Sequence, residues 1–277
     1  MTDSDCLKKF KPFAVFVFFI APLFLKGDEK LIPKAIFTAV FWEEFQNESF
    51  LYAPWGNESE ENASIVEISV GSSALSRKFA YYGNGELNLY SNKVDEFEES
   101  GLGNSEIILK NPAAKFQLPL SDSGVIKEYL LLFTDKKSNG TWRIFPMPFS
   151  TSEIPFGSYK FISQLRSNLF FIFGQEKITL APGKTAVVQG KPDEGQRGIM
   201  LKIMGQKNGR ATDLFSQKWG HSPRMRGIYF LGMNNGEMTV KRIIELESPI
   251  SASAGYGMPP ITVSEQNDDA VDLDSSF

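Results

Sequence analysis

The chain of 277 residues has very little of two reactive side chains: it contains one cysteine and one histidine. With a single cysteine, no disulfide can form within the chain. Histidine is the commonest metal ligand and the side chain whose charge changes near neutral pH. One copy, His221, leaves little room for a metal cage or a proton relay. We therefore expect no catalytic residues, no metal ion and no cofactor.

The chain also lacks an excess of positive charge. Its net charge is −4, and its isoelectric point is about 5.3. A basic surface field is what attracts nucleic-acid phosphates, so we expect no nucleic-acid partner. The spacings of a nucleophile elbow, an EF-hand loop and a zinc-binding helix are missing as well.

Paired carboxylates, as in glycoside hydrolases, are harder to exclude because any two acids can meet in space. The acidic clusters of the chain are Glu43-Glu44, Glu58-Glu60-Glu61 and Glu96-Glu98-Glu99. Each stands in a polar, turn-like setting, which favours a solvated charge run over a catalytic pair. A carboxylate-based glycan hydrolase remains the alternative if this protein is an enzyme.

Helical periodicity is nearly absent, and 93–100 is the single short helix candidate. In its place the chain has four Asn-Gly pairs between apolar, strand-like runs, at residues 84–85, 139–140, 208–209 and 235–236. Asn and Gly accept the positive φ angles of a type I′ turn, so the pair is a strong hairpin signal. The sequence therefore predicts an all-β protein with four such hairpins.

Short apolar runs separated by turn residues are typical of a sandwich or barrel. We expect strands at 35–42, 65–70, 77–82, 86–91, 106–110, 114–118, 128–134 and 141–147, and then at 157–163, 168–173, 177–180, 185–189, 198–205, 211–219, 226–233 and 237–246. Prolines from Pro146 to Pro155 interrupt the series, because proline supplies no donor to a central sheet ladder. We place a domain boundary there, giving β-sandwich domains at 31–148 and 149–247.

The two ends differ from the middle. Lysines precede an apolar block from Phe13 to Leu25, and a block of this length is too short to span a bilayer as a helix. We read residues 1–27 as a signal peptide, with an uncleaved membrane anchor as the alternative. Residues 248–277 are rich in Ser, Gly, Pro and Asp and predict a disordered acidic tail. We therefore expect export to the periplasm or cell envelope, with membrane contact only through an uncleaved N-terminal segment.

Several segments in the second half of the chain resemble those of a protein family. Ile154-Pro155-Phe156-Gly157-Ser158-Tyr159-Lys160-Phe161 is followed by Leu180-Ala181-Pro182-Gly183 and, further on, by Lys218-Trp219 and Met225-Arg226-Gly227. These segments resemble a family of uncharacterised exported bacterial tandem β-sandwich proteins of immunoglobulin-like type. The chain departs from that pattern at Ser163, where Asn is expected. The resemblance implies a fold and export, and it implies no activity.

One surface segment suggests a ligand. Its members that combine charge with an aromatic ring are Lys218, Trp219, His221, Arg224 and Arg226. Such residues can hold an acidic polymer or glycan by charge-assisted hydrogen bonds and stacking, although Trp219 can equally be a core residue. A second aromatic group, at residues 52, 55, 81 and 82, suggests a carbohydrate platform or core packing. We expect a non-enzymatic binding or assembly module whose partner is an envelope glycan or envelope protein, with a membrane-anchored subunit of an envelope assembly as a further alternative.

Overall fold

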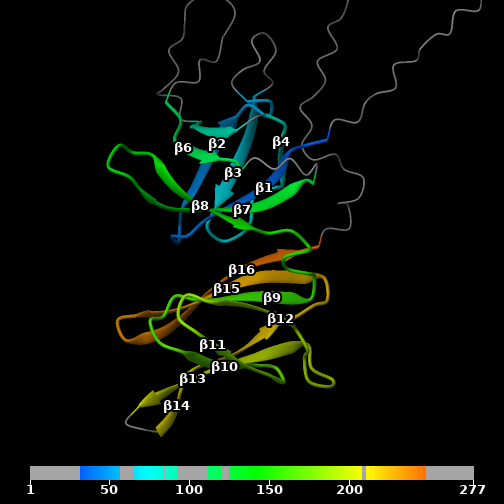
Figure 1. The fold of residues 1–277 in the computed structure, drawn as a ribbon, viewed down its shortest axis with the longest axis vertical. Helices are drawn as coiled ribbons and strands as arrows, with labels where there is room; N and C mark the ends of the chain where they lie inside the picture. Colours follow the sequence, from blue (N-terminus) through cyan, green and yellow to red (C-terminus); the bar gives the residue numbers. More distant parts are fainter. Residues whose placement is uncertain are drawn as a thin grey trace, which may run out of the picture. The chain divides into compact units, whose positions relative to one another are not determined.

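The computed structural model describes residues 32–56, 65–83, 85–92, 111–119, 125–207 and 210–247. Every element in these residues is a β-strand, so the all-β prediction is confirmed. The strands form four sheets of four strands in a sandwich-like arrangement (Figure 1). No helix in the described part of the chain is long and apolar enough to cross a membrane.

The first eight strands are β1 (Ala35–Phe41), β2 (Asn47–Tyr52), β3 (Val66–Gly71), β4 (Phe79–Tyr81), β5 (Glu86–Ser91), β6 (Ala114–Gln117), β7 (Lys127–Lys136) and β8 (Trp142–Pro148). The other eight are β9 (Ser158–Ser163), β10 (Leu169–Phe173), β11 (Glu176–Leu180), β12 (Thr185–Gln189), β13 (Gly198–Lys207), β14 (Arg210–Gly220), β15 (Met225–Asn234) and β16 (Glu237–Leu246). Strand β2 was not expected, because its polar start Asn47-Glu48-Ser49 hides the strand pattern.

The two halves repeat one topology. The first half has sheets β4-β1-β7-β8 and β3-β2-β5-β6, and the second has β12-β9-β15-β16 and β11-β10-β13-β14. Adding eight to each strand number of the first half gives the second half. Each half also contains one parallel pair, β1 with β7 and β9 with β15, among otherwise antiparallel pairs. The fold therefore supports a tandem arrangement, while the proposed domain limits stay a prediction.

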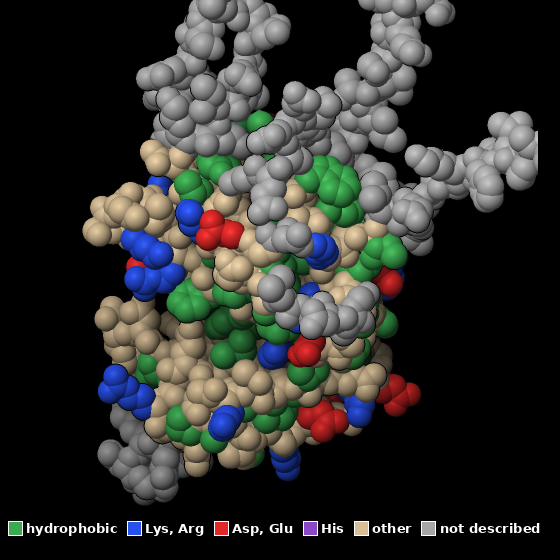
Figure 2. All heavy atoms as spheres, turned by 45° about the horizontal axis from the view of Figure 1, so that its top comes forward, with side chains coloured by type: hydrophobic (Ala, Val, Ile, Leu, Met, Phe, Trp, Pro, Cys, Tyr) green, Lys and Arg blue, Asp and Glu red, His purple; other side chains and the backbone are tan. Residues whose placement is uncertain are grey.

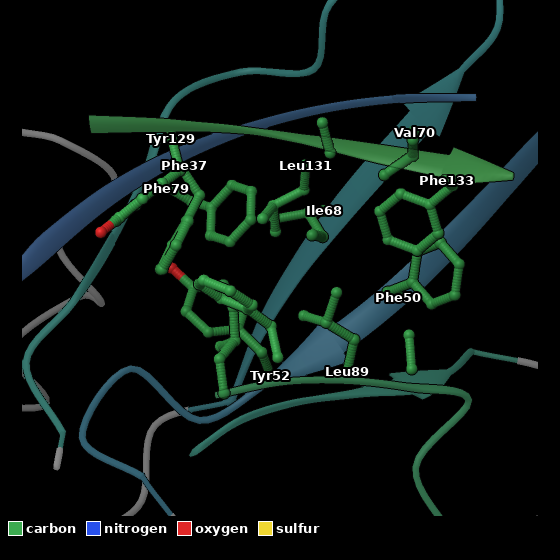
Figure 3. Packing of buried hydrophobic residues seen from close by; sticks show 14 of the residues in the cluster. Phe37, Phe50, Tyr52, Ile68, Val70, Phe79, Leu89, Tyr129, Leu131 and Phe133 are labelled. Atoms are coloured by element: carbon green, nitrogen blue, oxygen red, sulfur yellow. The ribbon is translucent and has the colours of Figure 1, made fainter. Parts of the chain in front are cut away.

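Each half has its own aromatic core between its two sheets. In the first half, Phe37 and Phe133 extend from β1 and β7 toward Phe50 and Leu89 of the facing sheet (Figure 3). In the second half, the Phe161 and Tyr229 rings stack with centroids 5.0 Å apart, and Phe171 packs on Phe161 at 4.7 Å. Aromatic pairs at such spacings add to the stability that area burial provides.

A third apolar layer joins the two sandwiches. It contains Val40 of β1, Leu130 and Leu132 of β7, Ile228 and Phe230 of β15, and Ile243 of β16, together with Phe149 and Ile154 of the connecting segment. These side chains point away from their own sandwich cores, so sheets β4-β1-β7-β8 and β12-β9-β15-β16 pack against each other. Phe149 and Ile154 thus fix the Pro-rich connection to this buried layer.

Burial on both faces explains the sequence of the central strands. Strands β1 and β15 are buried almost throughout, and β7 contains the apolar run Tyr129–Phe133. Near-continuous apolar runs are the pattern expected of strands that are covered on both faces. The edge strand β8 holds Pro146 and Pro148, which is where a sheet tolerates proline.

Two of the predicted Asn-Gly hairpins are described at their turns, and a third is fixed by its strand pairing. Asn235 and Gly236 have φ angles of 50° and 83°, the positive pair of a type I′ turn between β15 and β16. Gly140, with φ of 82°, ends the turn between β7 and β8, but Asn139 has no positive φ, so this hairpin turn is not the type I′ turn that the pair predicts. Lys207 pairs with Arg210 in β13 and β14, although Asn208 and Gly209 themselves lie outside the described residues.

The hairpin predicted at residues 84–85 is wrong. Strand β4 pairs with β1, whereas β5 pairs with β2 and β6, so the two strands belong to different sheets. Asn84 itself lies outside the described residues. Gly83 lies so close to Trp55 that an added Cβ would be 2.7 Å from its carbonyl oxygen. An Asn-Gly pair favours a reversal of the backbone but does not decide which strands pair.

Several predictions concern residues outside the described part. These are the signal segment 1–27, the helix candidate 93–100, the strand 106–110, two of the acidic clusters and the acidic tail 248–277.

Candidate interaction surface

The five residues predicted to bind a ligand do not share one surface. Lys218 and Trp219 end strand β14, His221 and Arg224 lie in the turn that follows, and Arg226 belongs to β15. Lys218 is exposed, Trp219 is buried in the core of the second sandwich, and Arg226 is fully buried. Adjacent residues of a strand point to opposite faces, which separates Lys218 from Trp219. Ligand binding by this segment stays a prediction.

Trp219 packs in the core near the open edge between β14 and β16. Its ring stacks on Tyr229 at 4.9 Å, and the Arg242 guanidinium lies 5.2 Å from its centroid. In β16 every second residue from Met238 to Leu246 is apolar except Arg242, which occupies the same face of the strand as Val240 and Ile244. The interruption is explained by this contact, because the guanidinium covers the indole ring at the sandwich edge.

His221 is held by a buried partner. Its Nδ1 atom and the Tyr159 hydroxyl share a hydrogen bond of 2.8 Å, and a Cβ at Gly190 would lie 2.6 Å from its Cε1 atom. Burial raises the pKa of Tyr159 to about 12. Burial also lowers the pKa of His221, which favours the neutral ring. A neutral imidazole nitrogen can accept a hydrogen bond from the tyrosine hydroxyl. At neutral pH the pair is therefore a structural hydrogen bond.

Arg224 is exposed and bound to its own neighbourhood. Its Nη2 atom donates to the Glu247 carbonyl oxygen at 2.8 Å, and its Nε atom lies 3.5 Å from the Glu247 carboxylate. This contact joins the β14–β15 turn to the end of β16. An exposed ion pair of this kind contributes little to stability.

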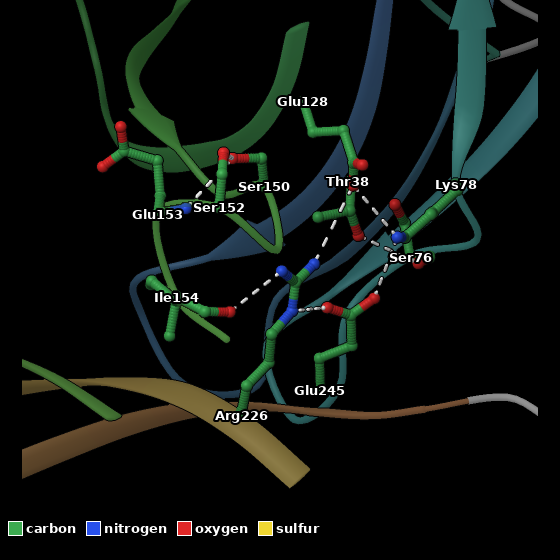
Figure 4. Close-up of polar contacts among 10 residues, drawn as sticks. All are labelled: Thr38, Ser76, Lys78, Glu128, Ser150, Ser152, Glu153, Ile154, Arg226 and Glu245. Carbon is green, nitrogen blue, oxygen red and sulfur yellow. Dashed lines mark hydrogen bonds and ion pairs between the residues drawn. The ribbon is translucent and has the colours of Figure 1, made fainter. Parts of the chain in front are cut away.

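The fully buried Arg226 is the centre of an ionic ring between the two sandwiches, whose other members are partly exposed (Figure 4). Its Nε atom donates to Glu245, its Nη1 atom donates to the Ile154 carbonyl oxygen at 3.2 Å, and its Nη2 atom lies 3.8 Å from Glu128. Lys78 closes the ring, because its Nζ atom is 3.2 Å from both carboxylates. Two cations and two carboxylates therefore balance each other.

Two phenylalanine side chains also contact Arg226, the central residue of the ionic ring. The Arg226 guanidinium lies 4.5 Å from the Phe149 centroid and 4.9 Å from that of Phe156. Both phenylalanines belong to the connecting segment. Arg226 thus contacts that segment, β7 and β16 at once, which suits a residue that fixes the two sandwiches against each other.

The carboxylates of the ionic ring do not resemble a catalytic pair. A glycoside hydrolase needs one carboxyl group that can give up a proton and a substrate between the two. Here Lys78 lies between Glu128 and Glu245, and each carboxylate is paired with a cation. Glu43 and Glu44, the described members of the predicted clusters, are exposed. No group of three metal-ligating side chains occurs among the described residues.

The second aromatic group is divided between core and surface. Tyr52 and Tyr81 are buried in the first sandwich core. Trp55 and Tyr82 are half-buried, and their rings stack at 4.5 Å with planes 24° apart. Core packing therefore accounts for half of this group, and the stacked pair remains near the surface.

Hydrophobic side chains reach the surface in several places. Figure 2 shows them between Lys, Arg, Asp and Glu side chains on the face that it draws. One such set is defined by the strand register on the outer face of β11-β10-β13-β14. Phe170 is opposite Met204, Ile172 is opposite Lys202, and Met200 is opposite Lys218. Opposed residues share a face of the sheet.

We call this set the outer apolar face: Phe170, Ile172, Met200, Met204, Lys177, Lys202 and Lys218. Phe170 is 37% exposed and Met200 is 42% exposed. Asp213 is the acid opposite Met204, and it pairs with Lys202 at 2.9 Å. The face has three lysines and one aspartate, so its net charge is positive. We call its apolar members the apolar stripe. Lys218 was predicted from the sequence, whereas the stripe was not, because its members lie on separate strands.

Comparison with protein-family models and with curated proteins finds no match for this chain.

Proposed function

We propose that this protein is a non-enzymatic binding or assembly module that is exported and acts at a bacterial cell envelope. The observation that carries the proposal is the outer apolar face. The outward positions of a sandwich strand are normally polar. Phe170 and Met200 are exposed on adjacent strands, with the partly exposed Ile172 and Met204 on the same face. An exposed apolar patch of this kind is a candidate surface for contact with another molecule.

The packing of the two sandwiches supports the same role. A shared apolar layer and an ionic ring around the buried Arg226 join the two halves within the described residues 32–247. A binding surface on such a body is pre-organised, which lowers the entropy lost on association. Export is supported by the resemblance to exported β-sandwich proteins and by the N-terminal pattern of lysines followed by an apolar block.

Binding is tested with the purified chain against peptidoglycan, envelope glycans and envelope proteins. We expect the variant Phe170→Ser/Met200→Ser to bind about tenfold more weakly than the unchanged chain, the equivalent of about 1.4 kcal/mol. Phe145→Ser is the matched control, because Phe145 is an exposed phenylalanine of β8 in the first sandwich. Binding that is absent, or equal in all three proteins, would contradict the proposal.

Export is tested by N-terminal sequencing of the protein recovered from the envelope fraction. A new N-terminus near residue 27 is the expected result. An intact Met1 rules out cleavage and favours the alternative of a membrane-anchored subunit. Recovery from the cytoplasm alone would overturn the location.

A further inference from the structure

The net charge of the outer apolar face indicates which kind of polypeptide segment can bind there. Lys177, Lys202 and Lys218 stand against Asp213, which leaves a net charge of +2 on the face. Two copies of this face brought together would place like charges opposite each other, which disfavours a symmetric dimer through it. The charge instead favours an acidic segment that also has apolar side chains.

The chain itself contains such a segment. Residues 265–277 hold five acids, Glu265, Asp268, Asp269, Asp272 and Asp274, and no Lys or Arg occurs from 248 onward. The whole chain has 33 acids and 29 Lys and Arg residues, so residues 1–264 hold 28 acids against 29 cations, a net charge of +1. The net negative charge of the chain therefore lies in this segment. Val271, Leu273 and Phe277 supply large apolar side chains within it.

We propose that the acidic segment 265–277 binds the outer apolar face of the same chain, with its carboxylates near the three lysines and its apolar side chains against Phe170, Ile172 and Met200. The inference rests on the proposed function, since it names an occupant of the same surface. The segment then competes with an external partner for that surface.

Distance does not prevent this contact. The described part ends at Glu247, and residues 248–264 can extend over about 55 Å. The two sheets of a sandwich are only about 10 Å apart, so the segment can reach the far sheet of the second sandwich. Attachment through a linker of this kind gives an effective concentration of about 1 mM or less, which makes weak contacts sufficient.

Methionine oxidation tests the proposal in the full chain. Met200 lies on the outer apolar face and is 42% exposed, whereas Met233, at the end of β15, is 46% exposed and serves as the internal control. With peroxide we expect Met200 to be oxidised about threefold more slowly than Met233, because the bound segment covers its sulfur. Replacing Asp268, Asp269, Asp272 and Asp274 by Asn is expected to remove the difference, as is high salt.

Equal oxidation rates of the two methionines in the unchanged chain would overturn the proposal. A second measurement is carbodiimide coupling, which joins a carboxylate to an adjacent lysine. We expect coupling of the acidic segment to Lys177 or Lys218 and not to Lys137, an exposed lysine of the first sandwich. Coupling to Lys137 at the same yield, or coupling only between differently labelled copies, would also overturn it.

These outcomes are separable from the proposed function. If the acidic segment does not protect Met200, an external partner can still bind the face, and the Phe170→Ser/Met200→Ser variant tests that binding. If that variant binds every envelope component as the unchanged chain does, the proposed function fails whatever protects Met200.

Discussion

Replacing Arg226 by Met tests how the two sandwiches are held together. The change keeps an unbranched apolar side chain and removes the guanidinium. The chain then loses the bond to Glu245, the bond to the Ile154 carbonyl oxygen, the ion pair with Glu128 and two ring contacts. Removing one member of a buried ion pair costs about 3–5 kcal/mol. Because Lys78 still pairs with both carboxylates, we expect about 3 kcal/mol.

The loss is measured by urea unfolding followed through tryptophan fluorescence. Single domains have about 5–15 kcal/mol of stability, so a loss of this size moves the midpoint clearly. Trp42 reports on the contact between the sandwiches, because its ring lies 4.9 Å from Phe230 and under the Lys241 ammonium. The chain has four tryptophans, so the signal of Trp42 is taken as the difference between each protein and its Trp42→Phe variant. We expect this signal to change at lower urea in Arg226→Met than in the unchanged chain.

Two further variants separate the ionic ring from a general loss of charge. Lys78 is 33% exposed, whereas Arg226 is 0% exposed, so Lys78→Met is expected to cost about 1 kcal/mol or less. Arg226→Lys keeps the charge but not the forked contacts, and its stability is expected to lie between the two. The reasoning is refuted if Arg226→Met unfolds at the same urea concentration as the unchanged chain, or if Lys78→Met costs as much.

Two more predictions concern pH and backbone geometry. The pKa of His221 is lowered in the folded protein, so its stabilisation is full above the unfolded pKa of about 6.5 and is lost as the pH falls through the folded value. Thermal melts from pH 7.5 to pH 5 should therefore show less pH dependence in His221→Gln, and an unchanged profile would contradict this. Gly236→Ala is expected to cost about 1–2 kcal/mol because of its φ of 83°. Gly71→Ala, with open space around it and no positive φ, is the control and should change the midpoint by less than half as much.

Local patterns predicted the strands well because alternation, apolar runs and turn residues are local properties. The parallel pairing of β1 with β7 was not predictable in this way, since it joins residues about 90 positions apart. The hairpin predicted at residues 84–85 was wrong for the same reason, because the strands that pair with β4 and β5 are distant in the sequence. The continuous apolar runs of β1, β7 and β15 did hold a signal for burial on both faces.

The candidate surface was harder to predict than the fold. The composition of the segment Lys218–Arg226 predicted one binding surface, yet its members lie in different places. Trp219 is in a core, His221 and Arg224 are in a turn, Arg226 is buried between the sandwiches and Lys218 is on an exposed face. Arg226 starts an apolar strand, and a lone cation in that position is a signal for a buried ion pair. The interruption at Arg242 was visible in the sequence too. Its cause, the Trp219 ring on another strand, was not.

The most direct test of the central claim is photo-crosslinking from the outer apolar face. A benzophenone amino acid replaces Phe170 in the full chain, and the same replacement at Phe145 is the control, because Phe145 is 51% exposed on the first sandwich. We expect that an envelope component is crosslinked from position 170 and not from position 145. Equal crosslinking from both positions, or none from position 170, would contradict it.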